Sequence, residues 1–131
     1  MRESRVYVGV QGPTLTAEAV SRRLGCEPTR AWRPGDRRGA STLVESDHGW
    51  QLESGLPQGM DLEAHLEWAS QVFGAYVEQL RAMTTGHNTR VQLVITTYSD
   101  DEANLSLELA PDLLALLARA GASVWLDTYS V

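Results

Sequence analysis

The chain has 131 residues, of which 43% are hydrophobic, and this size and composition suit a single domain (residues 1–131) with one hydrophobic core. Its formal net charge of −6 argues against general nucleic-acid binding, because phosphate neutralisation needs clustered cations. No apolar run is long enough to cross a membrane, no secretion signal is recognisable, and the lone Cys26 has no disulfide partner, so we expect a cytoplasmic protein without membrane contacts.

The first segment with a clear period is residues 5–11 (RVYVGVQ). Val6, Val8 and Val10 alternate there with polar, aromatic or glycine positions. A period of two is typical of a β-strand that buries one face. We therefore predict a strand whose valines face the core.

A helix is predicted to follow, because Thr16 can cap its N-terminus and Gly25 is placed to end it. Residues 26–32 (CEPTRAW) then return as a short strand. Residues 33–36 (RPGD) have the composition of a turn.

Residues 41–46 (STLVES) and 50–54 (WQLES), separated by three turn-forming residues, predict a β-hairpin. Asp61 can cap a long helix that runs to about Met83. Its apolar stripe is broad, so we expect this helix to contact two surfaces.

The pattern of strand, helix, glycine and strand recurs in the last third of the chain. Residues 90–98 alternate as a strand, a helix is predicted between Pro111 and Gly121, and residues 123–129 close the chain as a final strand. The repetition predicts an α+β fold: a ferredoxin-like duplicated split βαβ, in two layers, with the hairpin and the long helix inserted between the halves. Right-handed crossovers place residues 5–11 and 90–98 at the centre, with residues 123–129 beside the first strand.

The phases of these three strands sort their side chains onto two faces. The aliphatic face, which the two crossover helices should cover, consists of Val6, Val8, Val10, Val91, Leu93, Ile95, Val124 and Leu126. The other face is aromatic and polar and includes Tyr7, Tyr98, Trp125, Asp127 and Tyr129, with a gap at Gly9. Tyrosine and tryptophan suit a surface that is partly apolar and partly wet.

Three interpretations of this second face stay open. It can be an uncovered surface that binds a partner or small ligand, it can be covered by the long helix, or it can mediate homodimerisation. Glycine inside a central strand commonly marks a place where another group approaches closely, which favours the first interpretation.

Arginine is concentrated at the start of the chain: residues 1–40 hold eight arginines and four acids, whereas residues 41–131 hold three arginines and thirteen acids. There is no lysine. Arg30, Arg33, Arg37 and Arg38 can pair with the protein's own carboxylates, or they can bind an anionic ligand or partner.

No motif specifies a reaction. Residues 9–12 (GVQG) lack the pattern of a phosphate-binding loop, and Asp61 with His65 supplies only two potential metal ligands. His48 and Asp127 are isolated acid–base candidates. We therefore predict no catalytic residue, no metal site and no cofactor.

Several landmarks together resemble a known family. They are residues 15–36 (LTAEAVSRRLGCEPTRAWRPGD), 48–55 (HGWQLESG), 61–66 (DLEAHL) and 116–129 (LLARAGASVWLDTY), and together they span nearly the whole chain. The pattern is similar to the family called domain of unknown function 4279. This resemblance implies a small bacterial α+β domain and brings no assigned activity. The positions that match the pattern are Pro28, Gly35, Asp36, Trp50, Asp127 and Tyr129, and Trp125 makes the last strand bulkier than expected.

These observations favour a non-catalytic interaction module that binds a protein partner. Its expected contacts are the aromatic face (Tyr7, Tyr98, Trp125, Asp127 and Tyr129) and an arginine-rich segment with nearby tryptophans (Arg30, Trp32, Arg33, Asp36 and Trp50). The alternative is a binder of a small anionic ligand, or an enzyme acting on one, with Arg30, Arg33, Asp36 and His48 around a pocket.

Overall fold

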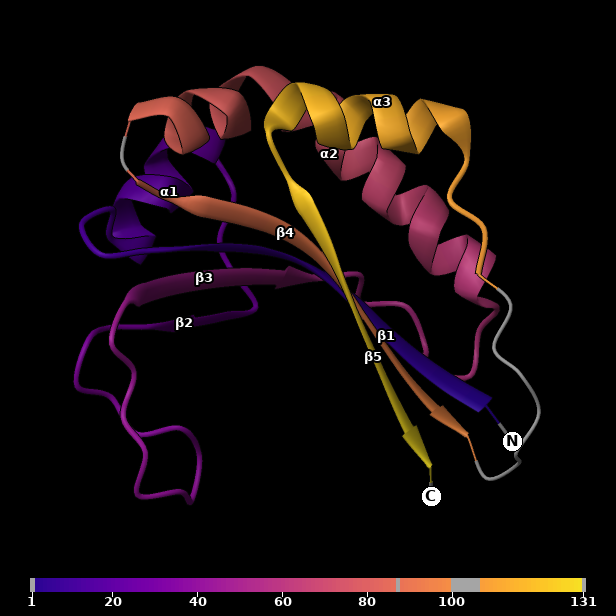
Figure 1. Ribbon diagram of the computed structural model, residues 1–131, viewed down its shortest axis with the longest axis horizontal. Helices are drawn as coiled ribbons and strands as arrows, with labels where there is room; N and C mark the ends of the chain where they lie inside the picture. Colours follow the sequence, from indigo (N-terminus) through magenta and orange to yellow (C-terminus); the bar gives the residue numbers. More distant parts are fainter. Residues whose placement is uncertain (1, 87, 100–106, 131) are drawn as a thin grey trace.

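The computed structural model describes residues 2–86, 88–99 and 107–130. It is an α+β structure in which three helices lie on one face of a five-stranded sheet (Figure 1). The elements in chain order are β1 (Arg2–Gly12), α1 (Ala17–Leu24), β2 (Arg30–Trp32), β3 (His48–Glu53), α2 (Leu62–Gly86), β4 (Arg90–Ser99), α3 (Pro111–Ala120) and β5 (Ser123–Ser130). The strand order across the sheet is β2-β3-β1-β4-β5.

The two long strands predicted at the centre are there, and they pair antiparallel from Arg2 opposite Ser99 to Gln11 opposite Arg90. Their aliphatic residues form the core as expected, since Val6, Val8, Val10, Val91, Leu93 and Ile95 are all buried. The period of two in β1 and β4 is therefore confirmed.

The boundaries of α1 and the C-terminal end of α3 follow the predicted capping chemistry, whereas α2 runs to Gly86, beyond the predicted end at about Met83. The Thr16 hydroxyl accepts a hydrogen bond from the Ala19 backbone N–H at 3.2 Å and begins α1. Gly25 ends α1 and Gly121 ends α3, with φ values of 68° and 72° in the left-handed region that glycine adopts without strain.

The long helix α2 contacts two surfaces, as its broad apolar stripe predicted. One side packs over β1 and β4, and another side packs against α3. Phe73, Leu80 and Met83 of α2 are completely buried. The helices of the second half therefore stack on each other, with α2 next to the sheet (Figure 1).

The predicted place of the last strand is wrong. β5 pairs in parallel with β4, over Gln92–Ser99 and Ser123–Ser130, and not with β1. The reason is that both edges of β1 are already occupied, by β3 on one side and β4 on the other. Only the first half is a split unit, with β3 between the parallel strands β1 and β2, so the structure does not have the predicted ferredoxin-like duplication.

The predicted hairpin is also wrong. Residues 41–46 form no strand against β3; an isolated bridge joins Arg37 and Val44, and β3 pairs with β2 and β1 instead. Leu43 and Val44 are 62% and 54% exposed, so this segment has no core face to bury.

The aliphatic residues of β5 are a third departure. Val124 and Leu126 point to the helix side of the sheet, but they are 39% and 42% exposed. Because α3 packs on α2, it does not extend over β5 as the sequence pattern suggested.

Candidate functional site

The side of the sheet opposite the helices, which we call the open face, carries most of the residues that the sequence singled out. The register places Glu53, Tyr7, Val94 and Trp125 in one row across β3, β1, β4 and β5. Among the described residues no helix lies on this face (Figure 1). Trp125 is 53% exposed and Tyr129 is 51% exposed, so these rings are not buried core aromatics.

The aromatic end of the open face lies on β4 and β5. Tyr98 and Tyr129 are register partners, and their rings stack with centroids 5.4 Å apart and an interplanar angle of 17°. Asp127 lies two residues before Tyr129 on the same face of the sheet, opposite Thr96. The stack holds both tyrosine rings in a fixed orientation at the sheet surface.

The other end of the open face is formed by β2, and it brings in part of the arginine-rich segment. Arg30 and Trp32 project from β2 on the same side as Gln51 and Gly49 of β3. The Trp32 ring lies directly over Gly49, where a Cβ atom would come within 1.9 Å of it. The Arg30 guanidinium lies 5.5 Å from the centre of the Trp32 ring, at cation–π distance.

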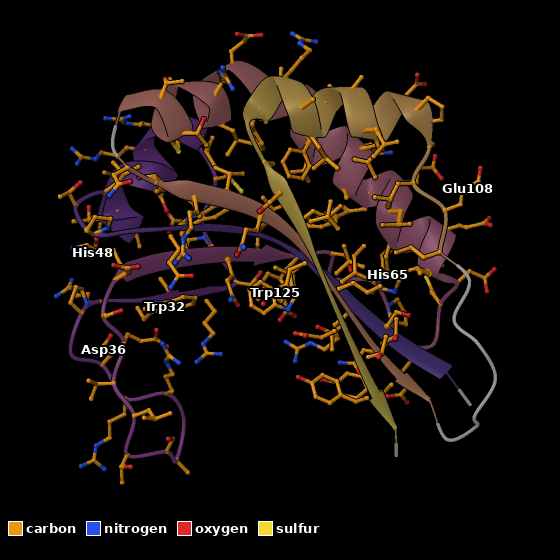
Figure 2. All side chains as sticks on the ribbon, in the orientation of Figure 1. Trp32, Asp36, His48, His65, Glu108 and Trp125 are labelled. Carbon is orange, nitrogen blue, oxygen red and sulfur yellow. The ribbon has the colours of Figure 1, made fainter. Side chains whose placement is uncertain are left out.

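Figure 2 shows Trp32 and Trp125 on the same side of the sheet, away from the helices. Between them lies Gly9, flanked across the strands by Gln51 and Gln92. A Cβ atom at Gly9 would meet only the Tyr7 ring, at 3.8 Å. The predicted gap at Gly9 is therefore present and has room for a side chain from outside.

One pair of opposite charges, Arg5 and Glu53, lies on the open face. The Arg5 guanidinium donates a hydrogen bond to the Glu53 carboxylate, and Glu53, followed by the phenol of Tyr98, raises the pKa of Arg5. Burial raises the pKa of the neighbouring Tyr7 phenol. Tyr7 therefore stays neutral and can donate a hydrogen bond at neutral pH.

Two predicted contacts, Arg33 and Asp36, are engaged in structuring their own loop. The Arg33 guanidinium pairs with the Glu18 carboxylate of α1 at 2.9 Å. A backbone hydrogen bond lowers the pKa of Glu18 most, and the hydrogen bond from Arg33 lowers it further. The Asp36 carboxylate accepts a hydrogen bond from the Arg33 backbone N–H at 2.9 Å, which closes the predicted turn. The Arg33–Glu18 and Arg38–Glu45 pairs agree with the interpretation that these arginines pair with the protein's own carboxylates.

Trp50 does not belong to the open face, so its prediction as a binding residue is wrong. It lies on the helix side of β3, is 1% exposed, and its indole N–H donates to the Ser21 hydroxyl of α1 at 3.1 Å. Its neighbours in the strand, Gln51 and Glu53, face the open side instead. Sequence reasoning missed these two because it assigned β3 to a hairpin.

One histidine, His65 of α2, lies in the core. His65 is buried at 1% exposure, and its Nδ1 atom is hydrogen-bonded to the Ser54 hydroxyl at 2.8 Å. Of the two potential metal ligands Asp61 and His65, only Asp61 is therefore exposed. Within residues 2–86, 88–99 and 107–130, no cluster of three or more potential ligands could hold a metal ion.

The described residues therefore form an α+β structure in which one face of the sheet is uncovered by helices and partly aromatic. The chain matches the family described as Domain of unknown function (DUF4279) over residues 2–131, and it belongs to that family. This confirms the resemblance found in the sequence. No curated protein and no solved structure matches the chain. No helix of the described part of the chain is long and apolar enough to span a membrane.

Proposed function

We propose that this protein is a non-catalytic interaction module that binds a protein partner on its open face. The observation that carries the proposal is the placement of all three helices on the opposite side, which leaves Trp125 and Tyr129 about half exposed. Tyrosine, tryptophan and arginine are the residues most enriched at energetically important interface positions. The open face presents all three kinds.

The size of the open face fits this role. The five strands hold 38 residues, and at about 3.3 Å per residue and about 4.8 Å between strands they cover roughly 600 Å². A standard protein interface takes about 800 Å² from each partner. The face and the adjoining Arg30 end of β2 can therefore supply most of one side of such an interface.

The gap at Gly9 suggests where the partner fits most closely. It lies in the middle of the sheet. Across the strands, Gln51 and then Arg30 follow on one side of Gly9, and Gln92 and then Ser123 follow on the other. A partner side chain in this gap can reach amide groups on both sides and the Tyr7 ring along the strand. The proposal assumes a cytoplasmic protein, for which a single free cysteine is ordinary.

The test is to capture partners from the native cell, purify the main candidate and measure its affinity for three variants. Tyr7→Ala should weaken binding by about 30-fold, the effect of losing a hot-spot residue worth about 2 kcal/mol. Gly9→Val should also weaken binding because it fills the gap, yet it should not lower the melting temperature, since valine suits a strand. Leu43→Lys, on an exposed loop, is the control. Unchanged affinity in both face variants would refute the proposal.

A further inference from the structure

The two edges of the sheet differ in how they are protected. The β2 edge is only three residues long and continues into the loop at Arg33. The β5 edge is eight residues long and contains no proline, lysine or arginine, and its register with β4 runs unbroken from Ser123 to Ser130. Natural proteins blunt exposed edges with short strands, charges, prolines or bulges. By these criteria β5 is a weakly protected edge, since Asp127 is its one charged residue.

β5 also exposes large apolar side chains on both of its faces. Trp125 and Tyr129 are 53% and 51% exposed on the open face, and Val124 and Leu126 are 39% and 42% exposed on the helix side. A central strand of a sheet carries apolar side chains on both sides because both sides are covered. β5 shares this feature with an internal strand, although polar residues alternate with its apolar ones and it lies at the edge (Figure 1).

We infer that β5 pairs antiparallel with β5 of a second copy of this chain, about a twofold axis that passes through Leu126. This pairing joins two five-stranded sheets into one sheet of twice the width, with the helices of both copies on one side. A twofold interface uses the same surface on both subunits, so β5 has to be complementary to itself.

Self-complementarity selects the register. In an antiparallel pair of identical strands, opposite residues share a face, so the axis must pass through a residue that faces itself. The middle of β5 lies between Leu126 and Asp127. An axis at Asp127 opposes two carboxylates, which is destabilising. An axis at Leu126 opposes two leucines and places Asp127 across from the partner copy's Trp125, so no like charges meet.

The same register explains why a second copy is the occupant rather than an unrelated peptide. A strand added to β5 lies beside Val124 and Leu126 on one side and beside Trp125 and Tyr129 on the other. Paired about Leu126, a second β5 sets the two Leu126 side chains opposite each other on the helix side and makes the two Trp125 side chains diagonal neighbours on the open face. The remaining opposite pairs, Val124 with the partner copy's Thr128 and Tyr129 with the partner copy's Ser123, bring no like charges together.

This inference does not rest on the proposed function, because it concerns pairing at the edge of the sheet, although Trp125 and Tyr129 belong to both surfaces. Sedimentation or light scattering of the 14.4 kDa chain should show the mass of a dimer at about 100 µM, well above a dissociation constant of about 1 µM. Leu126→Lys places two positive charges opposite each other at the axis and should give a monomer. Leu43→Lys makes the same change at an exposed loop residue and should stay dimeric.

Cysteine cross-linking tests the register without relying on a disruptive variant. In a Cys26→Ser background, Leu126→Cys should form a disulfide-linked dimer on mild oxidation, because residues facing each other on the axis lie within disulfide reach. Thr128→Cys should not, since its two copies are offset by four residues, or about 13 Å. A monomeric wild type at about 100 µM, a dimeric Leu126→Lys, or cross-linking at 128 and not at 126 would overturn the inference. If the wild type is monomeric, the β5 edge is instead free to pair with a segment of another protein.

Discussion

Gly49→Ala is the sharpest test of how the open face is built at its β2 end. The added methyl group would lie 1.9 Å from Cε2, 2.1 Å from Cζ2 and 2.5 Å from Cδ2 of the Trp32 indole. Non-bonded carbon atoms normally stay about 3.5–4.0 Å apart, so the ring must move by at least about 1.5 Å or swing off the strand. Because three ring atoms are involved, a small adjustment of the side chain's far end does not relieve the clash. We therefore expect Trp32 to leave its place over Gly49 and to lose its contact with Arg30.

The size of the effect follows from two opposing contributions. Overpacking a well-packed site costs about 1–3 kcal/mol, whereas replacing glycine by alanine returns about 0.4–1 kcal/mol by restricting the unfolded chain. The net loss in the free energy of unfolding is about 1–2 kcal/mol. For a chain of this length, this lowers the melting temperature by about 3–10 °C. Gly59→Ala is the matched control, since no atom lies within 4 Å of its added Cβ.

A double-mutant cycle separates this mechanism from a general loss of strand stability. Urea unfolding followed by circular dichroism would be measured for wild type, Gly49→Ala, Trp32→Ala and the double variant. If the indole is the obstacle, Gly49→Ala should be neutral or stabilising once Trp32 is alanine, with a coupling energy of about 1–3 kcal/mol. Additive losses in the double variant would show that Trp32 does not occupy the space above Gly49, and the reasoning would fail.

Other predictions address exposure, a buried contact and pH. Trp125→Phe should remove most of the fluorescence that iodide quenches, whereas Trp50→Phe should leave the intensity of the quenchable fluorescence unchanged; the reverse would contradict the open face. Ser54→Ala should destabilise the protein by about 1–3 kcal/mol in urea unfolding, because the buried His65 ring loses its hydrogen-bond partner; a neutral effect would show that this bond is dispensable. Burial raises the pKa of the Tyr7 phenol above 10.0, so the buried neutral phenol contributes fully to stability below pH 10. This contribution is lost as the pH rises through the folded-state pKa. Tyr7→Phe should flatten the alkaline fall in unfolding free energy, and an unchanged slope would assign the fall to other groups.

The parts of the fold that the sequence predicted are those governed by local rules. The alternation of Val6, Val8 and Val10, the Thr16 cap and the glycines at 25 and 121 each act within a few residues, and each is present as expected. Family membership was also visible in the sequence, because its landmarks are spread along the whole chain. The same local alternation placed Tyr7, Trp125 and Tyr129 on one face, which the register confirms.

The errors share a cause, which is competition between strands for a limited number of sheet edges. Each strand has two edges, and the sequence does not state which neighbour takes each one. β3 pairs with β1 on one edge and with β2 on the other, which leaves no edge for residues 41–46, turns Trp50 inward and leaves Leu43 outside. With both edges of β1 occupied, β5 can pair only at the far edge of β4.

The displacement of β5 has a consequence for function. At the position predicted beside β1, it would have been covered on its helix side, and Val124 and Leu126 would have been core residues. At the outer edge of β4 they are exposed, while their aliphatic character is that of a buried strand. Local sequence pattern and position in the sheet conflict at this strand, and such conflicts in natural proteins are expected at functional sites. Pairing with a second chain reduces the conflict, since it gives β5 a neighbouring strand on each side and brings the two Leu126 side chains together.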